Sequence, residues 1–417
     1  MREDAQDAAG RVDEQRLWQR HMEMAGIGAI PGNGVNRAAF SKEDIAARQR
    51  LIAWARARRF SVAMDAIGNL FIRRSGTEPD AAPVMTGSHM DSQPRGGRFD
   101  GMYGVLAGLE ALEAIDAAGI RTRRPLELVA WSNEEGGRFA PCTMGSAVYT
   151  GARAIGDFLE AKDNEEIALK DALAETLAAF PDVERRPLNA PAAAYIEAHI
   201  EQGPVLEREG KTIGVVTGIQ GLRWFNIEIS GEGAHAGTTP VASRKDALRE
   251  AVAAIHALHE LTRDASDTVR FTIGRMLVTP NSPNTVPSHV LFSVDLRHPD
   301  PDTIARLGNA VEPAIRNAVN RCSVTITPTL HDDPCSFDPT VVACVESAAQ
   351  ALNLSYRRMP SGASHDAMYM ARVCPTGMIF VPCEKGISHN EAENARPGDL
   401  AAGARVLTAA LLDLANR

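Results

Sequence analysis

The sequence lacks the features that mark a nucleic-acid-binding, membrane-spanning or zinc-knuckle protein. Its 44 Lys and Arg residues are outnumbered by 53 Asp and Glu residues, so the net charge of −9 would repel a phosphate backbone. The six cysteines show no CxxC spacing, which argues against a zinc knuckle or a dithiol redox centre and predicts reduced thiols. No stretch approaches the roughly 20 apolar residues of a membrane-spanning helix. Nucleic acid and membranes are therefore not expected partners.

The bulk composition is that of a globular enzyme with more than one domain. Hydrophobic residues make up 44% of the chain and charged residues 23%. At 417 residues the chain exceeds a usual single domain by about twofold or more, so two domains with their own cores are expected. The N-terminal stretch MREDAQDAAGRVDEQRLWQRH has no apolar core, which predicts neither a signal peptide nor a transit sequence. The expected location is the cytoplasm.

The first part of the chain alternates helix and strand patterns, which favours an α/β sheet. Ser41 and Asp44 form a capping-box pattern before an expected helix over 45–59. The apolar runs in APVMTGSHMD (82–91) and PLELVAWSNEE (125–135) predict buried strands, and each run ends in residue types that bind metals. Because open parallel sheets bind ligands beyond the carboxyl ends of their strands, both strands should point at one site.

A different pattern begins at about Gly218 and ends at about His331. It runs strand, helix, two strands, helix and strand, which predicts a small ferredoxin-like α+β unit with its helices on one face. Metal-type residues lie on both sides of this segment. We therefore expect a mixed-sheet catalytic domain made of 1–217 and 332–417, with residues 218–331 inserted as a separate α+β domain.

The metal-type residues are imidazoles and carboxylates placed after expected strands. This combination suits a borderline cation such as zinc, and an aspartate can bridge two ions with one oxygen to each. Asp100 is the expected bridge between the two ions. His89 and His199 would complete the ligands of one ion, and Glu135 and His389 those of the other. A centre of two metal ions that share a water molecule is typical of a hydrolase.

Asp91 is expected to support one of these ligands. It lies two residues beyond His89, from where its carboxylate can hold the second ring nitrogen and fix the tautomer.

Six sequence strings together resemble a known enzyme family. The strings are TGSHMDSQPRGGRFDG, SNEEGGRF, EAHIEQGP, GAHAGTTP, SGASHDA and ISHNEAE. They resemble the hydantoinase/carbamoylase branch of the M20 metallopeptidase-like amidases, which includes N-carbamoyl-L-amino acid hydrolases, β-ureidopropionases and allantoate amidohydrolases. The match spans nearly the whole chain in the expected order, and no metal position departs from the pattern. EAHIEQGP is the most discriminating string, because ordinary M20 aminopeptidases and deacylases differ there.

The resemblance implies roles for these residues. Glu134 would be the general base, and the chemistry agrees, because a carboxylate beside the ions can take a proton from water that the ions have acidified. The cofactor would be two divalent ions per subunit, zinc first, with manganese, cobalt or nickel as alternatives. His365 resembles a residue that supports the ligands. The implied ligand sets are His89, Asp100 and His199 for one ion and Asp100, Glu135 and His389 for the other.

The resemblance also implies a homodimer. His235 lies in GEGAHAGTTP, inside the expected inserted domain. In the resembling family this histidine reaches across the dimer to stabilise the oxyanion of the tetrahedral intermediate, which needs a donor aimed at developing negative charge.

Substrates of this family carry a free carboxylate, so a guanidinium should be available to bind it. Arg297 can pair bidentately with such a group, and Asn284 lies one strand-length upstream. Gln202 is expected to contact the ureido nitrogen or the amide. The backbone near Gly362 and Ala363 is expected to complete the pocket.

The predicted function is hydrolysis of the linear amide or ureido bond of an N-carbamoyl-L-amino acid or N-carbamoyl-β-alanine, with release of the amino acid, carbon dioxide and ammonia. Allantoate is the alternative substrate. A dinuclear aminopeptidase or N-acyl amino acid deacylase is more remote, because Arg297 favours an acid over a free amine. A metal-free binding protein is the alternative from another class, and it is disfavoured because no ligand is substituted.

Overall fold

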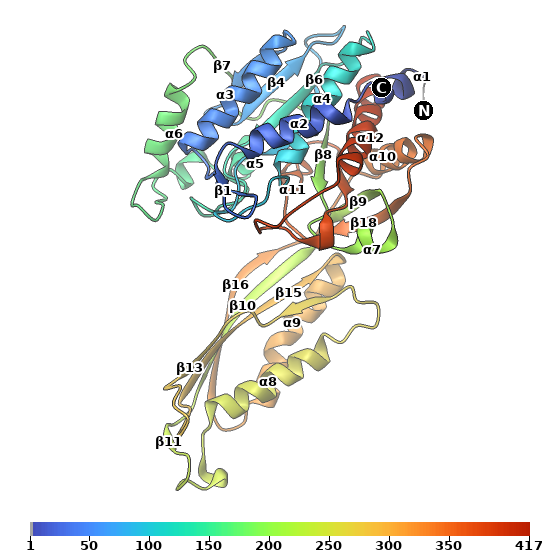
Figure 1. Cartoon of the computed structure of the whole chain (residues 1–417). Helices are drawn as coiled ribbons and strands as arrows, with labels where there is room; N and C mark the ends of the chain where they lie inside the picture. The colour runs from blue at the N-terminus through green and yellow to red at the C-terminus, as the bar shows by residue number, and fades with distance from the viewer. Residues whose placement is uncertain (1–2) are drawn as a thin grey trace. The chain divides into compact units, whose positions relative to one another are not determined.

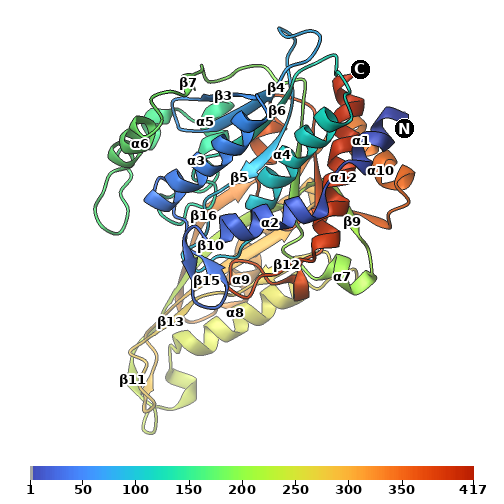
Figure 2. The ribbon, with the colours of Figure 1, turned by 45° about the horizontal axis from the view of Figure 1, so that its top comes forward.

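The computed structural model describes residues 3–417 and contains two compact units (Figures 1 and 2). Unit 1 consists of Met1–Thr217 together with Ser336–Arg417, and unit 2 of Gly218–Cys335. Unit 2 thus ends at Cys335, slightly beyond the expected boundary at 331. Within residues 3–417, no helix is both long enough and apolar enough to cross a bilayer.

Unit 1 is built on a ten-stranded mixed sheet of order β17-β9-β19-β8-β5-β6-β4-β3-β7, with β18 paired to β9. Its centre is four parallel strands, β19 (Thr376–Val381), β8 (Ala194–Ile200), β5 (Val84–His89) and β6 (Leu126–Trp131), in which every residue is buried. Burial along the whole length of a strand is typical of parallel sheets that are covered on both faces. The remaining strands are β3 (Ser61–Met64), β4 (Leu70–Arg74), β7 (Glu184–Arg185), β9 (Ile213–Ile219), β17 (Cys335–Ser336) and β18 (Tyr356–Ser361).

Two nearly fully buried helices pack against the central strands, α4 (Met102–Ala117) and α12 (Pro397–Ala415). The start of α4 approaches β8 so closely that a Cβ on Gly104 would lie 2.3 Å from the Ala198 carbonyl oxygen. This close approach fixes the loop before α4. The other helices of unit 1 are α1 (Glu3–Gly10), α2 (Glu14–Ala25), α3 (Lys42–Ala57), α5 (Met144–Tyr149), α6 (Leu169–Ala178), α7 (Val205–Glu209), α10 (Pro339–Ala351) and α11 (Ala367–Met370).

The start of α3 differs in detail from a capping box. The Ser41 hydroxyl caps the helix by accepting a hydrogen bond from the Asp44 amide at 3.2 Å. The Asp44 carboxylate, however, accepts from the amide of Phe40 at 2.9 Å, one residue before the cap. The sequence pattern therefore predicted the helix start correctly, while the returning bond is shifted by one residue.

Unit 2 has the βαββαβ order of a ferredoxin-like fold. Its antiparallel sheet has the order β12-β15-β10-β16, with β13 also paired to β15. Alternate residues of β10 (Gly221–Ser230) and β15 (His289–His298) are buried in one core with α8 (Ala247–Leu261) and α9 (Pro301–Ala318). Where the sequence pattern predicts a single strand between the first helix and β15, the structure has two short strands, β12 (Arg270–Thr272) and β13 (Met276–Thr279), and β16 spans Ser323–Asp332.

Candidate active site

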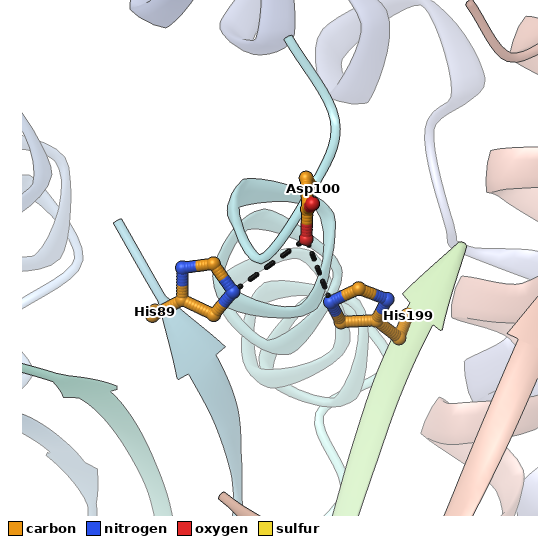
Figure 3. Close-up of side chains that lie close together, drawn as sticks. All are labelled: His89, Asp100 and His199. Atoms are coloured by element: carbon orange, nitrogen blue, oxygen red, sulfur yellow. Dashed lines mark ion pairs between the residues drawn. The ribbon is translucent and has the colours of Figure 1, made fainter. Parts of the chain in front are cut away.

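Parallel strands bring the metal-type residues of unit 1 together at one edge of the sheet. His89 is the last residue of β5, and His199 is the last but one of β8. Asp100 lies two residues before α4, where Gly101 adopts a φ of 63° and has no room for a Cβ against the His89 ring. The Asp100 Oδ1 atom lies 3.1 Å from His199 Nε2 and 3.6 Å from His89 Nε2 (Figure 3).

A second group uses the other oxygen of the same aspartate. Asp100 Oδ2 lies 3.3 Å from His389 Nε2, and Glu135 Oε2 lies 3.3 Å from the same nitrogen. In each group, the candidate ligand atoms lie within 4.8 Å of one another. Asp100 therefore offers one oxygen to each group, as a carboxylate that bridges two cations does.

The hydrogen bonds of the two buried imidazoles fit metal binding. His89 Nδ1 lies 2.9 Å from the Asp91 carbonyl oxygen, and His199 Nδ1 lies 2.8 Å from the Ile200 carbonyl oxygen. Because a carbonyl oxygen only accepts, each Nδ1 carries a proton, and Nε2 is the ring nitrogen that faces Asp100. A ring nitrogen this close to a carboxylate needs a positive charge between them, either a proton or a metal ion, so these residues fit a divalent ion.

The site concentrates buried negative charge. Burial raises the pKa of Glu134 well above its usual value, and the neighbouring carboxylates of Asp366 and Glu135 add to the rise although His89 opposes it. Burial and Asp100 likewise raise the pKa of Glu135 to about 7. Burial opposes the charge on Asp100 as well, yet hydrogen bonds from the histidines hold its pKa well below the usual range. A bound cation would relieve the repulsion among these acids.

Asp91 supports the site in a different way from the one expected. Its carboxylate Oδ1 is 3.8 Å from His89 Nδ1, and the backbone carbonyl of Asp91 makes the short contact with that ring. The carboxylate instead accepts hydrogen bonds from the amides of Glu134 at 3.2 Å and Glu135 at 3.1 Å. Asp91 therefore fixes the segment that carries both glutamates.

Sequence reasoning missed Glu393 and Ser388. Glu393 is buried, and its Oε1 accepts from the amides of Phe99 and Asp100 at 2.9 and 3.1 Å. The Ser388 hydroxyl lies 3.1 Å from Asp100 Oδ2 and 2.9 Å from Glu393 Oε2. These bonds orient Asp100. Both residues lie in the string ISHNEAE, but their contacts cross almost 300 positions of sequence, so no local pattern reveals them.

Sequence reasoning also missed a second buried acid, Glu197, although the pattern of its strand indicated its position. It lies two residues before His199 on β8, so both side chains point to the same face of the sheet. Its carboxylate accepts from the Ser88 hydroxyl at 2.7 Å and from the Ala367 amide at 3.0 Å. The two-residue period of the strand would have placed Glu197 behind the histidine.

Gln202 contacts Asp100. Its Nε2 donates to Asp100 Oδ2 at 2.9 Å, whereas its buried Oε1 has no hydrogen-bond partner among residues 3–417. That oxygen is available to accept a substrate N–H group.

The segment around His365 packs behind the candidate ligands. The His365 ring lies edge-on to that of His199, with centroids 4.5 Å apart, and its Nε2 is 3.0 Å from the Ser361 hydroxyl. Burial and the neighbouring His199 hold the pKa of His365 well below its usual value. The Ala363 amide donates to the same hydroxyl at 3.1 Å, and Gly362 is exposed.

Unit 2 carries the other three candidate residues, at two ends of its sheet. His235 lies on β11 (Ala234–His235), and the Ala236 amide donates to the Asn284 carbonyl at 3.0 Å, just before β14 (Thr285–Val286). β14 comes just before β15 in the sequence, so these residues lie near the end of β15 that begins with His289. Arg297 lies eight residues along that strand, a distance of about 26 Å.

The side chains of these three residues are held in defined forms. His235 Nδ1 accepts from the amides of Gly237 and Thr238 at 3.0 and 3.2 Å, so the ring proton is on the exposed Nε2. The Asn284 Oδ1 atom accepts from the Ser282 hydroxyl at 3.0 Å, which leaves its amide NH2 as a donor. The Arg297 guanidinium is paired with Asp295, with Nη2 2.9 Å from Oδ2.

Buried imidazoles and carboxylates at the carboxyl ends of parallel strands are the arrangement of a metal-dependent hydrolase. Residues 85–413 match the profile of peptidase family M20/M25/M40. A crystal structure of an amidase of the hydantoinase/carbamoylase family from Burkholderia multivorans superposes with a TM-score of 0.93 at 44% identity, over 97% of this chain and 98% of that one. The chain therefore belongs to peptidase family M20/M25/M40, among its hydantoinase/carbamoylase amidases.

Relatives with named activities cover almost the same length. N-carbamoyl-L-amino-acid amidohydrolase of Rhizobium meliloti is 39% identical over 97% of this chain and 97% of the relative. Ureidoglycolate hydrolase of Oryza sativa subsp. japonica is 35% identical over 97% of this chain and 85% of the relative. The predicted family and the predicted α/β hydrolase class are confirmed.

Proposed function

We propose that this protein is an amidohydrolase that cleaves the ureido C–N bond of an N-carbamoyl-L-amino acid, with N-carbamoyl-β-alanine as a related substrate. The observation that carries the proposal is the pair of candidate ligand groups sharing Asp100, in a chain that aligns over 97% of its length with an N-carbamoyl-L-amino-acid amidohydrolase. The products are the free amino acid, carbon dioxide and ammonia. The cytoplasm is the proposed location.

The proposed cofactor is two divalent ions per subunit, zinc first, with manganese, cobalt or nickel as alternatives. His89, Asp100 and His199 would hold one ion, and Asp100, Glu135 and His389 the other. Ions bound there supply polarisation of a carbonyl group and a lowered pKa of a water molecule.

Glu134 is the proposed general base. It belongs to neither ligand group, yet its Oε2 lies only 3.4 Å from His89 Nε2. Its raised pKa, caused first by burial, suits a carboxylate that takes a proton and then releases it. Glu134 accepts the proton of the attacking water and transfers it to the leaving nitrogen. The carbamate that remains decomposes to carbon dioxide and ammonia.

Donors from unit 2 complete the proposed site. Arg297 binds the substrate carboxylate, exchanging its pairing with Asp295 for a bidentate pair with the substrate. His235 Nε2–H stabilises the oxyanion, and Asn284 lies on the same ribbon as a second donor.

The spacing within unit 2 supports a homodimer. A small ureido substrate is far shorter than the roughly 26 Å along β15 that separates Arg297 from the end of the sheet next to His235. One copy of unit 2 therefore cannot place both residues on the same substrate. We assign His235 and Asn284 to the active site of the partner subunit, which makes the dimer part of the catalytic machinery.

Ureidoglycolate is the second candidate substrate. The rice relative named ureidoglycolate hydrolase covers 97% of this chain, and its substrate combines the same ureido and carboxylate groups. Allantoate has these groups too and stays a predicted alternative.

The test is ammonia release by the metal-reconstituted protein. The panel contains N-carbamoyl-L-amino acids, N-carbamoyl-β-alanine, ureidoglycolate and allantoate, with Glu134→Gln as the control. Turnover of an N-carbamoyl amino acid that disappears in the variant is the expected result. Turnover of ureidoglycolate or allantoate alone would replace the substrate assignment, and an inactive protein with two bound ions would refute the amidohydrolase.

A further inference from the structure

The turn that directly follows His235, residues 236–239, is hydrogen-bonded at both ends to one arginine. Arg244 lies just before α8 and is partly buried. Its Nε donates to the Thr239 carbonyl at 2.9 Å, and its Nη2 donates to the Ala236 carbonyl at 2.6 Å. The planar guanidinium is suited to two such bonds, because its N–H groups form a rigid fork. Arg244 therefore joins the two ends of the turn 236–239.

One of these bonds acts on the peptide group that fixes the imidazole. In a trans peptide, the carbonyl and the N–H group point in opposite directions within one plane. In the peptide between Ala236 and Gly237, the carbonyl oxygen accepts a hydrogen bond from Arg244, and the N–H group donates one to His235 Nδ1 at 3.0 Å. A charged donor on the oxygen both orients the plane and strengthens the N–H as a donor.

We propose that Arg244 is a positioning residue that keeps His235 in the tautomer with the proton on Nε2, through the peptide between Ala236 and Gly237. With Nδ1 occupied by two amide N–H groups, the ring offers only Nε2–H to a partner. Loss of the guanidinium frees the peptide to rotate, so that Nδ1 is no longer held as an acceptor. The inference rests on the proposed role of His235 in stabilising the oxyanion.

A neighbouring arginine provides a matched control. Arg244 and Arg249 both line a cavity of about 720 Å³ in unit 2. Arg249 is exposed, and within the described residues its side chain makes no hydrogen bond or ion pair. Arg249→Ala therefore removes the same charge from the same cavity without touching the turn.

The first test is kinetic and uses the metal-loaded full chain with an N-carbamoyl amino acid. Arg244→Ala should lower kcat about tenfold while KM changes little, because a misplaced donor weakens the transition state more than substrate binding. Arg249→Ala should match the wild type. Arg244→Lys should lie between, since an ammonium can serve one carbonyl but not both, and it replaces the alanine variant if that variant does not fold.

A double variant separates a positioning role from a general structural one. Arg244→Ala added to His235→Gln should lower kcat no further, because Arg244 acts through the imidazole that is already absent. An equal further loss in the double variant would overturn the proposal.

The second test reads the tautomer without any turnover. In the wild type, the ¹⁵N shifts of His235, assigned by their absence in His235→Gln, should show a protonated Nε2 and an unprotonated Nδ1. Arg244→Ala should give a mixture, and an unchanged tautomer would overturn the proposal. If His235→Gln leaves kcat unchanged, the proposed role of His235 fails, while the ¹⁵N shifts still decide what Arg244 does.

Discussion

The two units hold their candidate residues in opposite ways. In unit 1 three of the five candidate ligands, His89, Asp100 and His199, are buried, and each is bonded to its neighbours by side chains or backbone groups. In unit 2, His235 and Asn284 are exposed on a two-stranded ribbon. A buried set of acids and imidazoles can bind cations within its own unit. Exposed donors have a fixed tautomer and orientation but need another surface to act on.

The largest effect is expected from a substitution among the buried residues of unit 1. Glu134→Gln keeps the size of the side chain and removes the proton acceptor, so kcat should fall on the order of a thousandfold. The content of bound metal, measured by atomic absorption, should not change, because Glu134 belongs to neither ligand group. Loss of an ion from this variant would show that Glu134 is a ligand.

A smaller effect is expected on the exposed side. His235→Gln should lower kcat about a hundredfold, as expected for a lost oxyanion donor, with little change in KM. Its metal content and its thermal stability should equal those of the wild type, because the ring is exposed and belongs to unit 2. A variant that loses metal would contradict the division of roles between the units.

Asp91→Asn tests how the buried ligands are held. The amide keeps one acceptor oxygen but loses the charge that bonds to the amides of Glu134 and Glu135. We expect metal affinity, measured by competition with a chelator, to fall about 10- to 100-fold. Asp80→Asn, at an exposed aspartate, is the control. Equal affinities for the two variants would argue against this role of Asp91.

The smallest effect concerns a buried histidine beside the site. His21 packs against Phe99 with ring centroids 5.2 Å apart, and burial lowers its pKa to about 3. The unfolded chain therefore binds a proton below about pH 6.5 that the folded chain does not bind until about pH 3. As the pH is lowered through this window, this residue should reduce the free energy of unfolding by up to about 1.4 kcal/mol per pH unit.

The matching variants are His21→Leu and, at an exposed position, His256→Leu. The free energy of unfolding, measured with urea between pH 7.5 and pH 4, should fall less steeply for His21→Leu than for the wild type. His256→Leu should keep the wild-type slope. Parallel curves for all three proteins would show that His21 does not contribute to the acid sensitivity.

Much of unit 1 could be predicted from the sequence, because its signals are local. The apolar runs that become β5 and β6 end in His89 and shortly before Glu134, and the sheet rule then places both at one edge. The prediction of which Asp91 atom contacts His89 was wrong. Its spacing from His89 indicated a side-chain contact, but the turn presents the backbone carbonyl to the ring instead.

The rest depends on contacts between distant parts of the chain. Glu393 reaches the Asp100 amide because β19 and β5 both lie in the parallel centre of the same sheet. Asn284 and Arg297 are close in sequence, which suggested a shared pocket, but the extended β15 carries them apart.

The most direct test of a site assembled from two chains is complementation between two inactive variants. Glu134→Gln and His235→Gln subunits are co-expressed with different tags, and the heterodimer is purified over both. One of its two sites then has an intact Glu134 facing the partner's intact His235, so activity should return to about half that of the wild type. A heterodimer no more active than the two parent variants would contradict the proposal, because it would place Glu134 and His235 of the same chain in one site.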